Sequence, residues 1–515
     1  MSPARLTKSP RADFSRFCVP VPLLIIAFIL SGAAGLIYES IWARYLGLFV
    51  GHSAYAQIIV LVIFLGGMSL GAWAAGERST HFRYPLRLYA VVELLAGVLG
   101  IAFHGVFSGV SGLAYDHLFP ALAGGPGLTF AKWTIAGLLI LPQSILLGTT
   151  FPLMTAGALR MAPSAPGRTL SLMYFANSLG AAVGVLLAGF VLIAWGGLEG
   201  TLQTAAALNF LVAFVVYGGS RVFGWEDRPA PVPAVEATSS GTAPAGTDRG
   251  WSEPAVTPVR LLLAVAFGTA VASFTYEIAW IRMLSLVLGS ATHSFELMLS
   301  TFILGLALGA LFIRRYADRF ASPVRALGVV QVAMGALAVA TLPVYMWTFG
   351  WTSGLMDAVG STEGGYRLFS IARYLLCVLV MFPATICAGM TLPLITRTLY
   401  VTGAGERAIG RVYSINTLGS IIGVGLAGLL LMPLLGVKWL LVTGALLDVA
   451  IGVALLVWVW ERAPFVNPEW ARGALVATGG FLFAVITMTP LDPTILSSGV
   501  FRRGRLPEAG SQRML

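Results

Sequence analysis

The sequence predicts an all-α polytopic membrane protein that consists of two six-helix repeats and a thirteenth, C-terminal helix. Three observations predict this fold class. Of the 515 residues, 57% are hydrophobic and only 10% are charged, whereas a soluble globular chain carries roughly 25% charged residues. Apolar runs long enough to cross a bilayer recur along the chain. The pattern of the first half of the chain is repeated in the second half.

Composition and motifs exclude several classes of function. The formal net charge is +10, but in a membrane protein this excess belongs to cytoplasmic loops and does not indicate nucleic-acid binding. The cysteines Cys18, Cys377 and Cys387 have no metal or disulfide spacing, and the five histidines have no metal spacing. The chain contains no P-loop, no G-x-S-x-G and no G-x-G-x-x-G after a strand. We therefore expect no metal, no cofactor and no catalytic residue in this chain.

The chain begins with a basic segment, residues 1–19, which carries three arginines and a lysine. Positive residues concentrate on the cytoplasmic side of membranes, so we expect a cytoplasmic N-terminus. The apolar run that follows is too long for a signal peptide and lacks a small-residue cleavage site, so it predicts a first span. The expected location is the cytoplasmic (inner) membrane of a bacterium.

Residues 20–220 contain six apolar runs and form the expected first repeat. Each run supplies the ~20 residues that a spanning helix needs. The runs cover about 21–48, 53–76, 86–108, 129–156, 169–195 and 200–218. Residues 221–258 then break the pattern with Pro, Ala, Ser and Gly and scattered charge. Such a segment cannot bury a core, and we expect a disordered cytoplasmic linker.

Residues 259–461 contain six further runs and form the expected second repeat. They cover about 260–287, 292–313, 324–348, 368–396, 409–433 and 437–460. A shorter run at 473–489, within the segment 462–490, predicts the additional helix. If this run spans the membrane, the tail of residues 491–515 lies on the far side, yet the tail carries four arginines. Because arginines favour the cytoplasmic side, twelve spans remain the alternative to thirteen.

The repeat is visible residue by residue. Residues 38–51 read Y-E-S-I-W-A-R-Y-L-G-L-F-V-G, and residues 276–289 read Y-E-I-A-W-I-R-M-L-S-L-V-L-G, at a constant offset of 238. A G-x-T-x-P motif recurs at an offset of 241, and an N-[ST]-L-G-x-x-x-G motif recurs at 239. The change in offset along the chain fits small loop insertions between helices that the two halves share. Two parallel six-helix halves joined by a long loop are the plan of major-facilitator carriers.

These motifs resemble the membrane region of the spermidine-synthase-like membrane proteins, in which a major-facilitator-like module is fused to an aminopropyltransferase-like domain. The resemblance covers about 20–220 and 259–501. The tail L-D-P-T-I-L-S-S-G-V-F-R-R also resembles the junction that leads into the soluble domain in that family. The glycine-rich cofactor loop and catalytic aspartates of that domain do not occur in these 515 residues. The resemblance implies a link to polyamines and an aminopropyltransferase-like domain or protein as a partner.

Small and polar residues recur at matched positions within the spans. Glycines four residues apart let helix backbones approach closely, and these are Gly180, Gly184, Gly419 and Gly423. The asparagines Asn177 and Asn416 lie three residues before these two pairs of glycines, which we call the glycine stripes. The asparagines either bond across helices or line a cavity. A separate stretch, residues 309–319, resembles the cytoplasmic loop motif of major-facilitator carriers; the alternative interpretation is ordinary positive-inside charge.

Four prolines are also paired between the halves, and each removes a backbone donor inside a span. They are Pro142, Pro152, Pro383 and Pro393. We expect kinks at these positions. The kinks either expose carbonyl groups toward a cavity or only adjust the shape of the helix.

Ionisable residues inside apolar segments are costly and mark either a pairing or a pathway. At similar depth, Glu39 is expected to pair with Lys132, and Glu277 with Arg373. In one interpretation these pairs are structural locks. In the other they are gates, at which a cationic solute competes for the glutamate while nearby aromatic faces attract it; the aromatic residues are Tyr38, Trp42, Tyr276 and Trp280.

Two functions remain open at this point. The first is a carrier that moves a small polar or cationic solute, with a link to polyamines, through a cavity between the halves. The second is a membrane anchor for an aminopropyltransferase-like domain. The expected partners are the lipid bilayer, a small solute and, for the anchor, that domain. Matched glutamates, asparagines and prolines within the membrane favour the carrier, whereas the resemblance of the tail to a domain junction favours the anchor.

Overall fold

A computed structural model describes residues 20–50, 53–122, 125–223, 259–289, 292–358, 363–462 and 468–500. Throughout these residues the protein is helical and contains no strand. The predicted N-terminal segment 1–19, nearly all of the predicted linker and the part of the tail beyond residue 500 lie outside the described residues.

The first half contains six long helices in the expected positions. They are α1 (Pro20–Val50), α2 (Ser53–Arg78), α3 (Pro85–Leu113), α5 (Pro126–Met161), α6 (Pro166–Leu187) and α7 (Ile193–Phe223). Three short helical segments connect them: η2 (Ser79–His81), η3 (Ala114–Leu118) and α4 (Phe119–Ala121). The π-helical segment η4 (Ala188–Leu192) joins α6 to α7.

The second half repeats this order. Its long helices are α8 (Val259–Leu288), α9 (Thr292–Ile313), α10 (Pro323–Ala358), α11 (Glu363–Leu399), α12 (Arg407–Gly425) and α13 (Met432–Arg462). The π-helical segments η6 (Tyr400–Ala404) and η7 (Leu426–Leu431) flank α12. Two further helices follow, α14 (Pro468–Met488) and α15 (Pro493–Leu496).

The described residues contain ten helical stretches that are long and apolar enough to cross a membrane. Two of these stretches, Pro166–Phe223 and Arg407–Arg462, are 58 and 56 residues long, about twice what one crossing needs. Each contains a glycine with positive φ, Gly197 at 63° and Gly436 at 72°. Because the chain turns there, each stretch supplies two spans. The two halves therefore contribute six spans each.

The glycine stripes lie at helix contacts within each half. An added Cβ at Gly180 would overlap the Ile29 carbonyl oxygen of α1, and one at Gly184 would overlap the carbonyl of Ala33. In the second half, Gly419 and Gly423 lie against α8 in the same way. The glycines therefore allow the backbones of α1 and α6, and of α8 and α12, to touch.

We expect Gly180→Val to lower the free energy of unfolding by roughly 1–3 kcal/mol, because the new side chain has no space beside α1. Gly105→Val on α3 is the matched control, since nothing lies within 4 Å of a Cβ added there. The midpoints of thermal unfolding of the two purified variants measure the difference. Equal midpoints would contradict the close contact.

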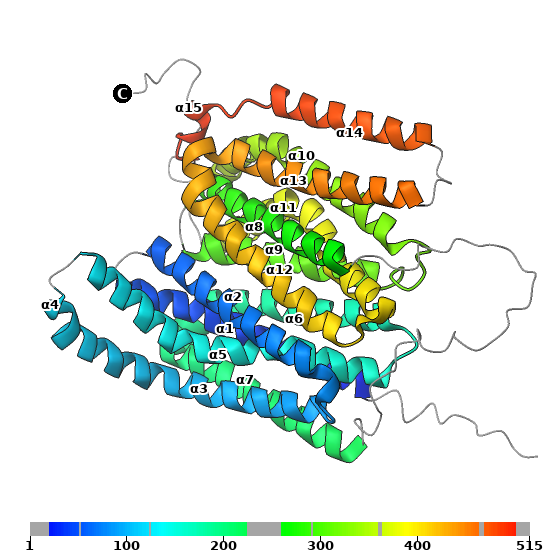
Figure 1. Cartoon of the computed structure of the whole chain (residues 1–515). Helices are drawn as coiled ribbons and strands as arrows, with labels where there is room; N and C mark the ends of the chain where they lie inside the picture. Colours follow the sequence, from blue (N-terminus) through cyan, green and yellow to red (C-terminus); the bar gives the residue numbers. More distant parts are fainter. Residues whose placement is uncertain are drawn as a thin grey trace, which may run out of the picture.

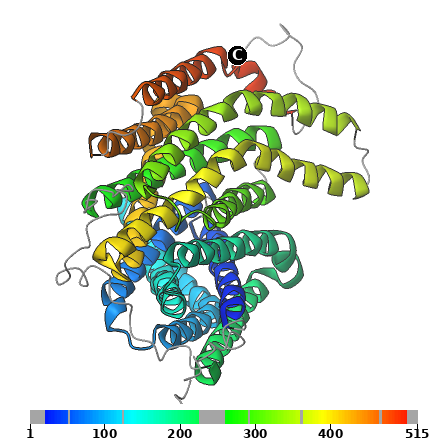
Figure 2. The same cartoon turned by 90° about the vertical axis from the view of Figure 1, so that its right-hand side faces the viewer.

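The two halves pack mainly through two helix pairs, α2 against α12 and α6 against α9, with smaller contacts of α6 with α11 and of α5 with α12. In Figure 1 the second half lies above the first, with α2, α6, α9 and α12 at the boundary, and the turned view in Figure 2 keeps this arrangement. At the α2–α12 contact, Ser69 Oγ lies 3.0 Å from Ser414 Oγ. A Cβ on Gly76 would lie 2.5 Å from the Cα of Gly410, so the backbones touch there too.

The additional helix α14 is present and packs on α10. Lys438, two residues after the Gly436 turn, donates from Nζ to the carbonyls of Ile486 (2.7 Å) and Thr489 (2.9 Å). The last carbonyls of a helix have no partner within the helix, and a lysine is a favourable one. Lys438 therefore attaches the end of α14 to α13. The apolar part of α14, Gly473–Met488, is short for a full crossing, so thirteen spans remain a prediction.

A candidate functional site between the two halves

Glu39 and Glu277 occupy the same position in the two halves, on α1 and α8. Glu277 is only 5% exposed, and Glu39 is half-buried. The Glu39 carboxylate is close enough to Glu277 to act on it electrostatically. Within the described part of the chain, neither carboxylate has a hydrogen-bond or ion-pair partner. Each half thus places one acid at the same position of its first helix, and neither acid has a base as a partner among the described residues.

The predicted ion pairs of these acids are wrong. Lys132 does not reach Glu39; its Nζ lies 5.4 Å from the centre of the Phe119 ring on α4. Arg373 does not reach Glu277, because it donates to the Leu288 carbonyl at 3.0 Å and to Ser294 Oγ. Leu288 ends α8, so Arg373 satisfies a carbonyl that the helix leaves without a partner. The prediction placed each acid and base at a similar depth in the membrane. Depth does not determine the direction in which each side chain leaves its helix.

One ion pair joins the halves near the C-terminal end of α1 and the N-terminal end of α9. Arg44 Nη2 lies 2.5 Å from Glu296 Oε1, and the Glu296 side chain is 4% exposed. The carboxylate lies over Gly189, where a Cβ would overlap it. Arg44 is five residues beyond Glu39, or ~7.5 Å along the helix. The base of the repeated Y-E-x-x-W-x-R motif therefore bonds to the other half. The equivalent Arg282 is exposed.

A second ion pair joins the halves at the opposite end. Arg160, near the end of α5, donates to both oxygens of Glu406 at 2.7 and 2.8 Å, and both side chains are buried. The same guanidinium donates to the carbonyls of Ser79, Phe82 and Arg83. These bonds use all five N–H donors of an arginine.

Two further contacts close the same end. Arg411 of α12 donates to both oxygens of Glu77 of α2, at 2.5 and 3.1 Å. Asp318, from the loop after α9, accepts from the backbone N–H groups of Gly167 and Arg168, each at 2.8 Å. These are among the first N–H groups of α6, which have no partner within the helix and attract negative charge. The stretch 309–319 therefore contacts the first half through its aspartate.

The aromatic residues of the repeated motif point away from the interface. Tyr38, Trp42, Tyr276 and Trp280 are at most 1% exposed and lie in the core of their own half. Tyr38 stacks on Trp42 with ring centres 5.7 Å apart. Their faces are covered, so they do not form the predicted aromatic surface beside the glutamates.

In the first half, the hydroxyl of Tyr38 belongs to a buried polar network. It donates to Asn209 Oδ1 at 3.0 Å, and Asn209 donates to Glu93 Oε2 at 2.5 Å. Ser31 donates to the other oxygen of Glu93 at 2.5 Å. The network joins α1, α3 and α7, and both carboxylate oxygens of Glu93 are satisfied.

In the second half, the acid and the amide of this network have exchanged positions. Offsets of 238 and 239 place Thr269, Tyr276, Gln331 and Asp448 at the positions of Ser31, Tyr38, Glu93 and Asn209. Tyr276 donates to Asp448 Oδ2 at 2.5 Å, and Thr269 donates to Gln331 Oε1 at 3.3 Å. The acid thus lies on α3 in the first half and on α13 in the second. Gln331 Nε2 and Asp448 Oδ1 have no partner among the described residues.

The other candidate residues lie along the spans. Asn177 and Asn416 are half-buried, and within the described residues their amides form no hydrogen bond, which leaves both interpretations of them open. The four paired prolines lie inside α5 and α11, both of which continue as helices past them. Their role as kinks remains a prediction.

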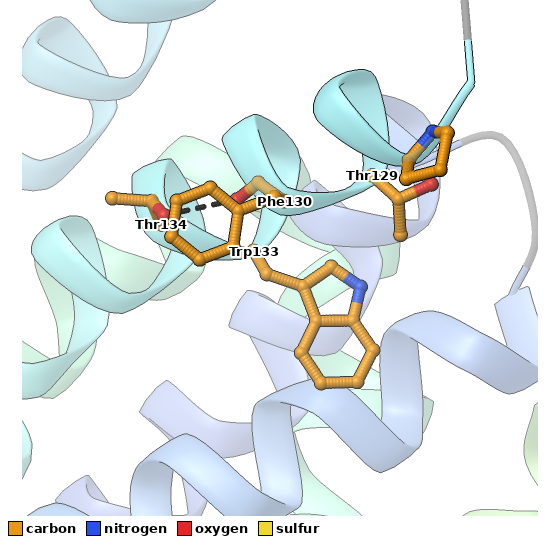
Figure 3. Close-up of a pocket in the computed structure, with 5 residues that line it drawn as sticks. Thr129, Phe130, Trp133 and Thr134 are labelled. Atoms are coloured by element: carbon orange, nitrogen blue, oxygen red, sulfur yellow. Dashed lines mark hydrogen bonds between the residues drawn. The ribbon is translucent and has the colours of Figure 1, made fainter.

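A shallow surface pocket lies at the start of α5 (Figure 3). It is lined by Pro126, Thr129, Phe130, Trp133 and Thr134, and Thr134 donates to the Phe130 carbonyl at 2.9 Å. Phe130 and Trp133 are exposed. None of the candidate residues lines this pocket, so it is separate from the site between the halves.

Sequence reasoning missed the cross-half ion pairs and the polar networks. The partners of the ion pairs are 246 to 334 residues apart and are not equivalent in the repeat, so neither spacing nor the repeat identifies them. The networks could have been found, because the offset that relates the two motifs also relates Glu93 to Gln331.

The fold resembles that of solved transporters. The human organic anion transporter MFSD10 (TETRAN) matches over 86% of this chain and 100% of its own, with 13% identity and a TM-score of 0.55. A bacterial homologue of the iron transporter ferroportin matches over 84% and 98%, with 12% identity and a TM-score of 0.52. The transporter FucP matches over 87% and 99%, with 12% identity and a TM-score of 0.51. The fold is major-facilitator-like.

A sequence relative lies in a different functional class. Polyamine aminopropyltransferase 2 of Streptomyces coelicolor is 27% identical over 267 residues, which are 48% of this chain and 45% of that protein. The chain thus matches less than half of the length of this curated relative. No protein-family model matches the chain.

Proposed function

We propose that this protein is a membrane carrier that moves a small polar or cationic solute between its two major-facilitator-like halves. The observation that carries the proposal is the pair Glu39 and Glu277. Two acids without bases inside a membrane protein are costly unless a cation or a proton neutralises them. In transporters built from repeats, substrate sites lie near the midplane at the interface of the repeats.

The cross-half ion pairs supply gates on both sides of this site. Arg44–Glu296 closes one end, and Arg160–Glu406, Glu77–Arg411 and the Asp318 contact close the other. Movement of one half against the other requires that these contacts break at one end while they hold at the opposite end.

We further propose that the N-terminus and the linker are cytoplasmic and that the membrane is the inner membrane of a bacterium. Arginines cluster in the connections that follow α2, α5, α9 and α11 and in the helix ends that flank them, whereas the other connections within the two repeats are nearly free of Lys and Arg. This alternation supports the orientation. The end closed by Arg160 and Glu406 is then the cytoplasmic one.

Flux of labelled solutes into proteoliposomes tests the carrier. With a transported cation, we expect Glu39→Gln and Glu277→Gln each to reduce flux by at least about tenfold, which is ~1.4 kcal/mol of lost interaction. Glu461→Gln is the control, because this acid lies at the end of α13 with its side chain 69% exposed. Folded Glu39 and Glu277 variants with unchanged flux would contradict the assignment of the site.

The alternative is a membrane anchor for an aminopropyltransferase-like domain or protein, and the similarity to Polyamine aminopropyltransferase 2 favours it. An anchor needs no solute pathway. The absence of flux above empty vesicles across polar and cationic solutes, polyamines included, would favour the anchor. Retention of a co-expressed aminopropyltransferase-like domain in the membrane fraction by this chain would support it further.

A further inference from the structure

The interface contains more acid than base at its centre. The outer pair matches one arginine with one glutamate, and so do both inner pairs. Glu39 and Glu277 lie between these layers without a partner in the described residues. The nearest arginines of their own helices do not compensate, since Arg44 bonds Glu296 and Arg282 is exposed. The described centre therefore holds two uncompensated acids.

The helices that carry these acids, α1 and α8, are not packed against each other. The halves meet mainly through α2–α12 and α6–α9, and α1 and α8 do not form a packed pair within the described residues. Gly35 is one turn before Glu39 on the same face of α1. Gly35 is buried, yet a Cβ added there would meet no atom within 4 Å. This shows open space inside the protein beside Glu39.

The donor set does not suit an inorganic divalent ion. Mg²⁺ and Ca²⁺ require about six or more oxygen ligands, and no group of three or more His, Cys, Asp or Glu residues that could hold a metal occurs in the part of the chain that the structure describes. Two isolated carboxylates suit ammonium groups better, because each forms a charge-assisted hydrogen bond with one N–H donor. Their equivalent positions in two related halves present two equal acceptors across the interface.

From these observations we infer that Glu39 and Glu277 together bind one organic dication, with one ammonium group on each carboxylate. A flexible molecule with equal cationic ends fits two equal acids from two equivalent helices. One dication neutralises both carboxylates, whereas a monocation leaves one charge buried and uncompensated. This inference rests on the proposed function, because it names the class of the transported solute.

Thermal unfolding of the purified full chain in detergent tests the inference, since a ligand that binds only the folded state raises the midpoint with concentration. The probes are propane-1,3-, butane-1,4- and pentane-1,5-diammonium chloride. Butylammonium chloride and MgCl₂ at equal ionic strength are the comparisons. We expect at least one diammonium to bind about tenfold more tightly than butylammonium. Glu39→Gln and Glu277→Gln should remove this preference, and Glu461→Gln should retain it.

An equal response to butylammonium, an equal response to MgCl₂, or a preference that survives both substitutions would overturn the inference. Flux in proteoliposomes separates it from the proposed function. Selective binding of a diammonium without flux would retain the dication site and reject the carrier. Flux of another solute without diammonium binding would retain the carrier and reject the dication site.

Discussion

Glu406→Gln should be among the most destabilising single substitutions at the interface, with an expected loss of about 3–5 kcal/mol in the free energy of unfolding. The substitution keeps the shape of the side chain but removes the charge that balances Arg160. Because the guanidinium is 4% exposed and its carboxylate partner is 3% exposed, water cannot replace that charge. The Arg160 charge would remain buried without the carboxylate that accepts two of its hydrogen bonds, which is the costly outcome.

Glu77→Gln is the matched control for this prediction. It removes the acid of the neighbouring pair, whose side chains are 40% and 30% exposed, so we expect a loss of no more than ~1 kcal/mol. Chemical unfolding of the two variants in the same detergent gives the comparison. Equal losses for the two substitutions would mean that water reaches Arg160, and the proposed gate at this end would then be open in the resting protein.

Much of the fold could be predicted from the sequence, because its signals are local or repeated. Bilayer thickness fixes the length of each span, and the repeated motifs relate the two halves before any contact is known. The positive-φ turns at Gly197 and Gly436 were not predicted. The predicted breaks between runs, residues 196–199 and 434–436, do contain these two glycines, but hydropathy alone does not show that the backbone turns there through a positive φ.

The candidate site could be predicted only in part. Identical positions in the two repeats identified Glu39 and Glu277, but depth alone assigned them the wrong partners. The bond that uses Arg373 is the reason in the second half, because the end of α8 requires a donor and Arg373 supplies it. The sequence shows how many charged residues lie within the spans. It does not show toward which neighbouring helix each charged side chain points, because that depends on packing with segments distant in the sequence.

The exchanged acid and amide of the two polar networks lead to a prediction of strong coupling. Gln331→Glu places a second carboxyl group in the network of Asp448, and we expect it to destabilise the protein by several kcal/mol, because two buried acids then have only the hydroxyl groups of Tyr276 and Thr269 as donors and no amide. Adding Asp448→Asn restores one acid and one amide, in the arrangement that Glu93 and Asn209 have in the first half. The double variant should therefore be more stable than the Gln331→Glu single variant.

A double-mutant cycle in the free energy of unfolding measures this effect, and we expect a coupling energy of roughly 1–3 kcal/mol between positions 331 and 448. The reciprocal cycle in the first half, Asn209→Asp with Glu93→Gln, is the matched test, since it converts that half to the second-half arrangement. Additive effects in both cycles would contradict the equivalence of the networks. Coupling in the first half alone would fit the open geometry of the second, in which Gln331 Nε2 and Asp448 Oδ1 have no partner among the described residues.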